Sequence, residues 1–61
     1  MDRTAAIADL SPLYARAVRL ADRGLEDVAI AARLHLAPES VPALLEIAEA
    51  KLTRLLLEDL P

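Results

Sequence analysis

Gly24 is the single glycine in a chain of 61 residues, and most other positions are alanine, leucine, glutamate or arginine. These residue types favour helix, whereas strands are enriched in aromatic and β-branched residues. The chain has one aromatic side chain, Tyr14, and no cysteine. We therefore expect an all-α fold of one domain, in which the glycine and four prolines mark helix boundaries.

The first part of the chain contains signals for two helices. Asp2 or Thr4 is suited to cap a short helix that ends just before Ser11. Ser11 is then an N-cap followed by Pro12 in the first helical position. The helix that starts here should continue to about residue 23, because Gly24 supplies the left-handed conformation that ends a helix.

The second part predicts a short helix, a tight turn and a long final helix. The short helix should cover about residues 26–34, with residues 35–37 as the turn. The final helix has two possible starts, Pro38 in its first position or Ser40 as N-cap. We prefer Ser40, because Pro42 in a helix begun at Pro38 would remove a backbone hydrogen bond.

The final helix, expected to continue to about Asp59, has one apolar face. The core candidates that recur on it at 100° per residue are Val41, Leu45, Ala48, Leu52, Leu55 and Leu56. The residues expected to be buried together are Ile30, Leu34, Leu36, Val41, Leu45 and Leu52. Leu44 and Ile47 lie to one side of this face and Leu57 lies nearly opposite it, where a small core is not expected to cover them.

Charge and residue types narrow the possible functions. Seven Lys and Arg against ten Asp and Glu give a net charge of −3, which repels nucleic-acid backbones and anionic membranes. The first ten residues have acidic groups and no long apolar run, so we expect neither a secretory signal nor a membrane span, and a cytoplasmic location. One histidine without cysteine partners does not form a structural zinc site, and no cofactor is expected.

A set of regularly spaced residues runs from Gly24 to Leu52. Its members are Gly24, Leu25, Ile30, Ala31, Leu34, Leu36, Val41, Leu45, Ala48, Lys51 and Leu52. This spacing resembles region four of bacterial sigma factors. The helix-turn-helix of LuxR-type response regulators shares most of it, although Ala48 fits the sigma form better. The resemblance covers residues 13–57 and implies a helix-turn-helix bundle of three main helices plus a short N-terminal one, in a single domain over residues 1–61.

The resemblance implies that the last helix reads the major groove of DNA. Ser40 matches the family's small hydroxyl residue, and Lys51 and Arg54 are the cations of this helix. The positions that are commonly basic or polar in the family hold Pro42, Leu44, Glu46, Ile47, Glu49 and Ala50 here. We therefore expect the chain alone to bind DNA weakly.

Three arginines of the preceding helix form a second group of DNA-contact candidates. Arg16, Arg19 and Arg23 share one face at spacings of three and four. Alternatively they form a solvated face, or pair with Glu46 or Glu49 across the domain. Tyr14 on the same helix is predicted to lie in the core with its hydroxyl at the rim, with an interface position as the alternative.

The favoured function is protein–protein contact by a transcription-associated module. Leu44 and Ile47, with Leu55 nearby, are the predicted partner-binding residues, because the fold normally presents this face to a partner. A domain this small is marginally stable, so we expect a homodimer or a complex with another transcription protein. The alternative is a DNA-binding regulator that acts as a dimer or with a basic partner chain. An enzyme or a small-molecule substrate is not predicted, because His35 has no identifiable nucleophile or orienting partner.

Overall fold

The computed structural model describes residues 1–58, which are mostly helical. The elements are α1 (Arg3–Ala8), α2 (Pro12–Asp22), α3 (Asp27–Leu34), the single 3-10 turn η1 (Pro38–Ser40) and α4 (Val41–Glu58). The all-α expectation is confirmed, and so is the succession of one short and three longer helices. The expected end of the last helix at Asp59 lies outside the described residues.

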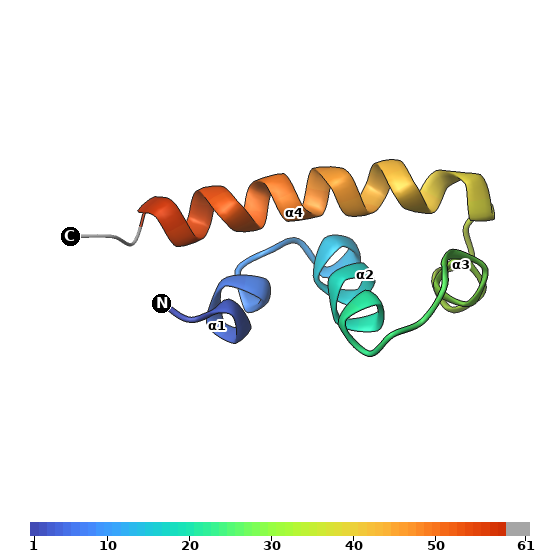
Figure 1. Cartoon of the computed structure of the whole chain (residues 1–61), viewed down its shortest axis with the longest axis horizontal. Coiled ribbons are helices and arrows are strands. Elements are labelled where there is room, and N and C mark those ends of the chain that lie inside the picture. The colour runs from blue at the N-terminus through green and yellow to red at the C-terminus, as the bar shows by residue number, and fades with distance from the viewer. Residues whose placement is uncertain (59–61) are drawn as a thin grey trace.

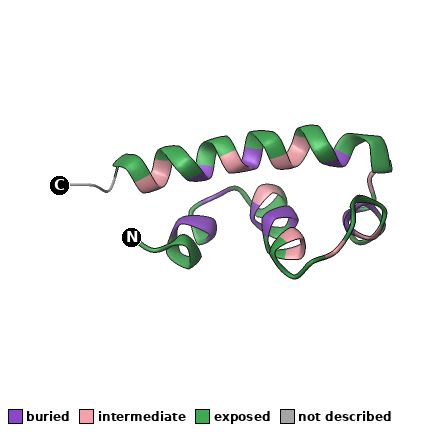
Figure 2. Ribbon diagram, viewed as in Figure 1, coloured by how far each residue is buried: buried purple, intermediate pink, exposed green. Residues whose placement is uncertain are grey.

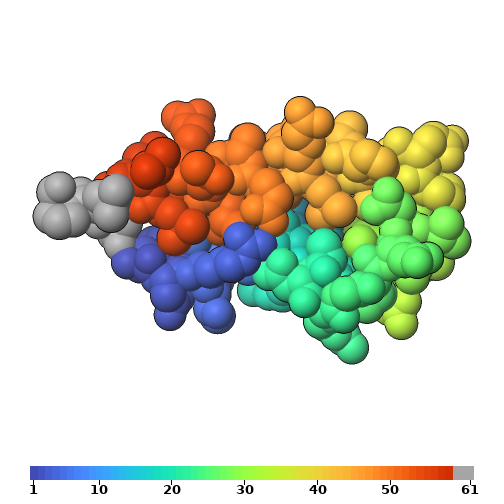
Figure 3. Space-filling view, viewed as in Figure 1, coloured from blue at the N-terminus to red at the C-terminus, as the bar shows by residue number. Residues whose placement is uncertain are grey.

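The helix α4 runs along one side of the molecule, and α1, α2 and α3 lie in a row against it (Figure 1). Its 18 residues make a rod about 27 Å long, which is most of the length of the 39 × 18 × 17 Å molecule. Neighbouring helices of the row contact one another, but within residues 1–58 α1 does not contact α3. Within residues 1–58, no other element covers the side of α4 that faces away from the row (Figure 3).

Local stereochemistry accounts for the helix ends. The Asp2 carboxylate accepts a hydrogen bond of 2.8 Å from the Ala5 amide, so Asp2 and not Thr4 caps α1. Gly24 has φ +89° after α2, as expected for a residue that ends a helix. His35 ends α3 in the left-handed region with φ 59° and ψ 44°, which supports its reading as a turn residue.

The start of α4 combines features of both expected starts. Pro38 opens the 3-10 turn, in which the Ser40 amide donates to the Ala37 carbonyl at 3.0 Å. The α-helix itself begins at Val41, as the preferred alternative required. Pro42 therefore lies in the first turn, where its missing N–H has no helical partner to lose.

The core consists of two clusters of buried residues, and the expectation of one joint cluster is wrong. The first cluster joins α1, α2 and α4 and contains Ala6, Ile7, Leu10, Ala15, Val18, Ala48 and Leu52. The second joins α2, α3 and α4 and contains Ala17, Ile30, Ala31, Leu34 and Val41. Leu52 is thus separated from Ile30, and Leu36 and Leu45 are only half-buried at the second cluster. Three helices in a row have no common centre, so the buried residues form a line along α4 (Figure 2).

A guanidinium ties α1 to both of its neighbours. Arg3 donates to Asp22 of α2 at 3.0 and 3.1 Å and to Glu49 of α4 at 2.8 Å. The hydrogen bond to Asp22, followed by that to Glu49, raises the pKa of Arg3 above its ordinary range. All three side chains are nearly half exposed, so each pair contributes only about 0.2–1 kcal/mol. The suggested pairing of Glu49 with the arginines of α2 is wrong, since Glu49 is bound to Arg3.

Candidate interaction surfaces

The face of α4 opposite the core carries an exposed strip of small and apolar residues. We call Ala43, Ile47, Ala50 and Leu57 the outer strip; all are exposed, Ile47 by 46% and Leu57 by 59%. They follow one another at spacings of four, three and seven residues, so they share one side of the helix. Arg54 occupies the remaining position of this spacing, within the strip between Ala50 and Leu57, and Glu46 flanks the strip.

The predicted partner-binding residues do not form one exposed face. Leu44 is half-buried against the second core cluster and Leu55 against the first. The expectation that the core leaves Leu44 uncovered is therefore wrong. Ile47 is exposed as predicted, and its exposed neighbours along the helix are Ala50 and Leu57. The spacing of Leu57 from Ile47 and Ala50 was the signal in the sequence that pointed to this strip.

The DNA-contact candidates near α4 are spread out and partly engaged. Ser40 is exposed in η1, about 20 Å along the helix axis from Arg54. Lys51 Nζ lies 5.8 Å from the centre of the Tyr14 ring, a cation–π contact. Arg54 Nη2 lies 3.9 Å from Glu58 Oε1 one turn further on. These residues do not gather into a basic stripe that follows the outer strip.

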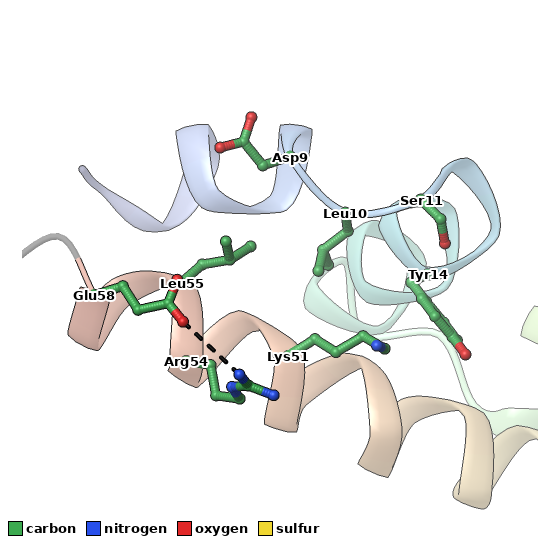
Figure 4. Close-up of a pocket in the computed structure, with 8 residues that line it drawn as sticks. All are labelled: Asp9, Leu10, Ser11, Tyr14, Lys51, Arg54, Leu55 and Glu58. Carbon is green, nitrogen blue, oxygen red and sulfur yellow. Dashed lines mark ion pairs between the residues drawn. The ribbon is translucent and has the colours of Figure 1, made fainter.

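A hollow of about 350 Å³ lies between the α1–α2 connection, α2 and the C-terminal half of α4 (Figure 4). Its lining is Asp9, Leu10, Ser11, Tyr14, Lys51, Arg54, Leu55 and Glu58. Two carboxylates and two cations balance one another in this lining, so the hollow offers no net charge to select an ionic ligand. Tyr14 packs against the first core cluster and borders the hollow, which agrees with the predicted position at the rim of the core.

A second hollow, of about 310 Å³, is surrounded by arginines. Its lining is Arg16, Arg19 and Leu20 of α2, Arg23 directly after α2, and Arg33 of α3; we call it the arginine hollow. The first three arginines are exposed on one face of α2, as their spacing predicted. Arg33 was not predicted to join them, because only the packing of α3 on α2 brings it there. The Arg16 Nη2 group donates to the Arg33 carbonyl oxygen at 3.4 Å and links the two helices.

No group of three or more His, Cys, Asp or Glu residues that is placed to hold a metal ion occurs within residues 1–58. His35 is exposed in the turn after α3.

Within residues 1–58, no single helix has the length and apolar content that a membrane span requires. Only α3 and the segment 38–58 taken together have this length and composition, and the pair is bent by 105°. Comparisons with protein-family models, curated proteins and solved structures find no match to the chain.

Proposed function

We propose that this chain is a transcription-associated helix-turn-helix module, without enzymatic activity, that acts in the cytoplasm mainly through protein–protein contact. The contact surface is the outer strip of α4, and its partner is a second copy of the chain. The observation that carries the proposal is the exposure of Ile47 and Leu57 on the one long face of α4 that the row of helices leaves free. Such a face favours association, because burying it removes apolar area from water.

The angle between α3 and the last helix supports the helix-turn-helix part of the proposal. The segment Pro38–Glu58 is bent by 105° from α3, and residues 35–37 connect the two. Helix-turn-helix motifs have interhelical angles of about 90–120° and turns of about three to four residues. Together with the resemblance to sigma region four, this angle supports the proposal that α4 is the counterpart of a recognition helix. Its outer face carries small and apolar residues in place of a basic stripe.

Charge placement favours an antiparallel pairing of two α4 helices. When two copies are centred on Ala50, Ala43 of one lies level with Leu57 of the other, and Glu46 lies level with Arg54. Opposite charges then face each other at two levels, one on each side of the central Ala50, whereas a parallel pairing brings like charges to the same level. A two-fold arrangement also offers each copy the same surface. The small side chains of Ala43 and Ala50 allow the helices to approach closely.

The molar mass of the wild-type chain, measured by light scattering from low to high micromolar concentration, tests the proposal directly. We expect a concentration-dependent rise from monomer to dimer, because a 61-residue domain covers only about 60% of its unfolded surface by itself. A monomer throughout this range would contradict the self-association, and another transcription component would then be the partner to test against the outer strip.

A charge reversal tests the antiparallel arrangement. Glu46→Lys should weaken dimerisation by about three- to tenfold, because it loses two symmetry-related surface ion pairs. Adding Arg54→Glu to it should restore the wild-type dissociation constant. Glu39→Lys, an exposed reversal in η1 away from the outer strip, is the matched control. If the double variant dimerises no better than the single one, the helices do not pair in this register.

The chain alone should bind duplex DNA only at non-specific strength. The outer strip offers neither a basic stripe nor base-reading side chains, so we expect a dissociation constant no tighter than about 10⁻⁶ M at physiological salt. Fluorescence anisotropy with labelled duplexes of different sequence measures this. Tight and sequence-selective binding would instead favour the alternative function, a DNA-binding regulator that acts as a dimer or with a basic partner chain.

A further inference from the structure

The arginine hollow lies on the side of α2 that faces away from α4. Val18 of α2 is buried in the cluster that contains Ala48 and Leu52 of α4, so this side of α2 faces α4. At 100° per residue, Arg16 lies 200° from Val18 and is therefore on the opposite side. The hollow and the outer strip are thus separate surfaces, and a ligand in the hollow does not compete with pairing through α4.

Positive charge is concentrated at this hollow and is not neutralised by the neighbouring carboxylate. Four of the seven Lys and Arg residues surround it, in a chain whose net charge is −3. Asp22 is the acidic residue of α2, and its two oxygens accept hydrogen bonds from Arg3 at 3.0 and 3.1 Å. Within residues 1–58, neither Asp22 nor any other carboxylate forms an ion pair with an arginine of the hollow.

The four arginines are arranged around an apolar floor. Leu20 is half-buried against the second core cluster, and Arg16, Arg19 and Arg23 surround it on α2. Arg33 of α3 lines the hollow on the side opposite the α2 arginines. The hydrogen bond from Arg16 to the Arg33 carbonyl oxygen links α2 to α3 at the hollow. The guanidinium groups therefore come from two elements with a fixed separation, which distinguishes the hollow from a row of arginines on a single helix.

We propose that the arginine hollow binds phosphate groups of a compact ligand that carries several negative charges, as a diphosphate does. The planar guanidinium presents paired N–H donors that match two oxygens of one phosphate, which the point charge of a lysine does not. All four cations here are arginine. A single carboxylate would leave most of the positive charge uncompensated. A volume of about 310 Å³ is at the lower end of small-ligand sites and accommodates a diphosphate or the diphosphate end of a nucleotide.

Titration of the full chain with inorganic pyrophosphate, followed by NMR of backbone amides and arginine Nε–H groups, tests the proposal. At low salt we expect saturable shifts at Arg16, Arg19, Arg23 and Arg33, and smaller ones at Lys51 and Arg54. Affinity should fall as salt is added, because cations at an open site are screened. Shifts that do not saturate, or that are equal at all cations, would overturn the proposal.

Charge-matched variants separate a site from the effect of net charge. Arg19→Gln and Arg33→Gln should each weaken pyrophosphate binding by about tenfold. This is the lower end of the effect expected when a hydrogen bond to a charged group is lost. Lys51→Gln removes the same charge from an exposed cation of α4 that lies outside both the hollow and the outer strip, and should change affinity by less than about twofold. Equal losses in all three variants would show attraction by net charge and would overturn the site. Far-UV circular dichroism of each variant verifies that its helices are intact.

Two further ligands identify the source of the phosphate and its chemistry. If a short DNA duplex binds more tightly than pyrophosphate and shows the same dependence on Arg19 and Arg33, the phosphates belong to a nucleic-acid backbone. If pyrophosphate binds at least as well as the duplex, the ligand is a free or nucleotide phosphate. The second result supports the proposal, and the first would overturn it in favour of contact with a nucleic-acid backbone. A glutamate-rich peptide that binds as tightly as pyrophosphate, with the same loss in both variants, would overturn it.

Discussion

Replacing Ile30 with alanine should remove a large fraction of the free energy of unfolding. Ile30 is fully buried at the centre of the second core cluster, where α2, α3 and α4 meet. Truncating such a side chain costs about 2–5 kcal/mol through lost burial and the cavity left behind. A domain of this length has a total stability of only about 3–9 kcal/mol, so urea unfolding followed by circular dichroism should show a midpoint lowered by about a fifth or more.

The matched control is Val28→Ala, two residues earlier on α3. Val28 is also β-branched but is 66% exposed, so its truncation removes little buried area. We expect a change within about 0.5 kcal/mol, with a small gain because alanine has the higher helix propensity. If both variants lost the same stability, or if Ile30→Ala lost none, the position of α3 against α2 and α4 would be wrong.

The second large effect is expected for Ile47→Glu, which should convert the dimer to monomer. In the monomer the new carboxylate would be exposed on the outer strip, so the fold should be retained. In the antiparallel dimer it would enter the contact twice and would be buried without a cationic partner at its own level. Each buried carboxylate should cost roughly 1 kcal/mol or more, and there are two in the dimer. We therefore expect the dissociation constant of the dimer to rise at least about thirtyfold. Light scattering across the dilution series used for the wild type measures it.

Val28→Glu is the control for charge and for loss of an apolar side chain. It makes the same type of change on α3, away from the outer strip, and should leave the dimer intact. If Val28→Glu dissociated the dimer as well, the added negative charge alone would explain the result. A dimer that persisted in Ile47→Glu would place the contact elsewhere on the molecule.

The helix boundaries were predictable from the sequence because they depend on local stereochemistry. The signals are Pro12 in the first position of α2, Gly24 after that helix, and His35 in a left-handed turn. Each of them determines the backbone conformation only of residues close to it in the chain. The apolar face of α4 was predictable for the same reason, since its period is a property of one helix. The start of α4 was predicted to the residue, although the 3-10 turn from Pro38 was not.

The arrangement of the helices around α4 was not predictable, because periodicity shows which face is apolar but not which helix covers it. Leu44 was expected on a free surface, yet it packs partly buried against the second core cluster. Leu52 and Ile30 were expected in one core, yet α2 separates them into two clusters. The arginine hollow depends on Arg33, which is ten residues beyond Arg23 and reaches it only through the packing of α3 on α2.

The row of helices along α4 makes the two ends of the domain energetically separable. Within residues 1–58, α1 contributes to the first cluster and α3 to the second, and the two do not touch. The helix α1 contacts only α2 and α4, and α3 contacts only α2, α4 and the η1 turn next to it in the chain, as units contact their neighbours in a linear repeat array. Local opening of α1 therefore breaks the Arg3 ion pairs and part of one cluster while α3 keeps all of its contacts. The two ends of such a domain therefore open in separate steps, each set by contacts with nearest neighbours.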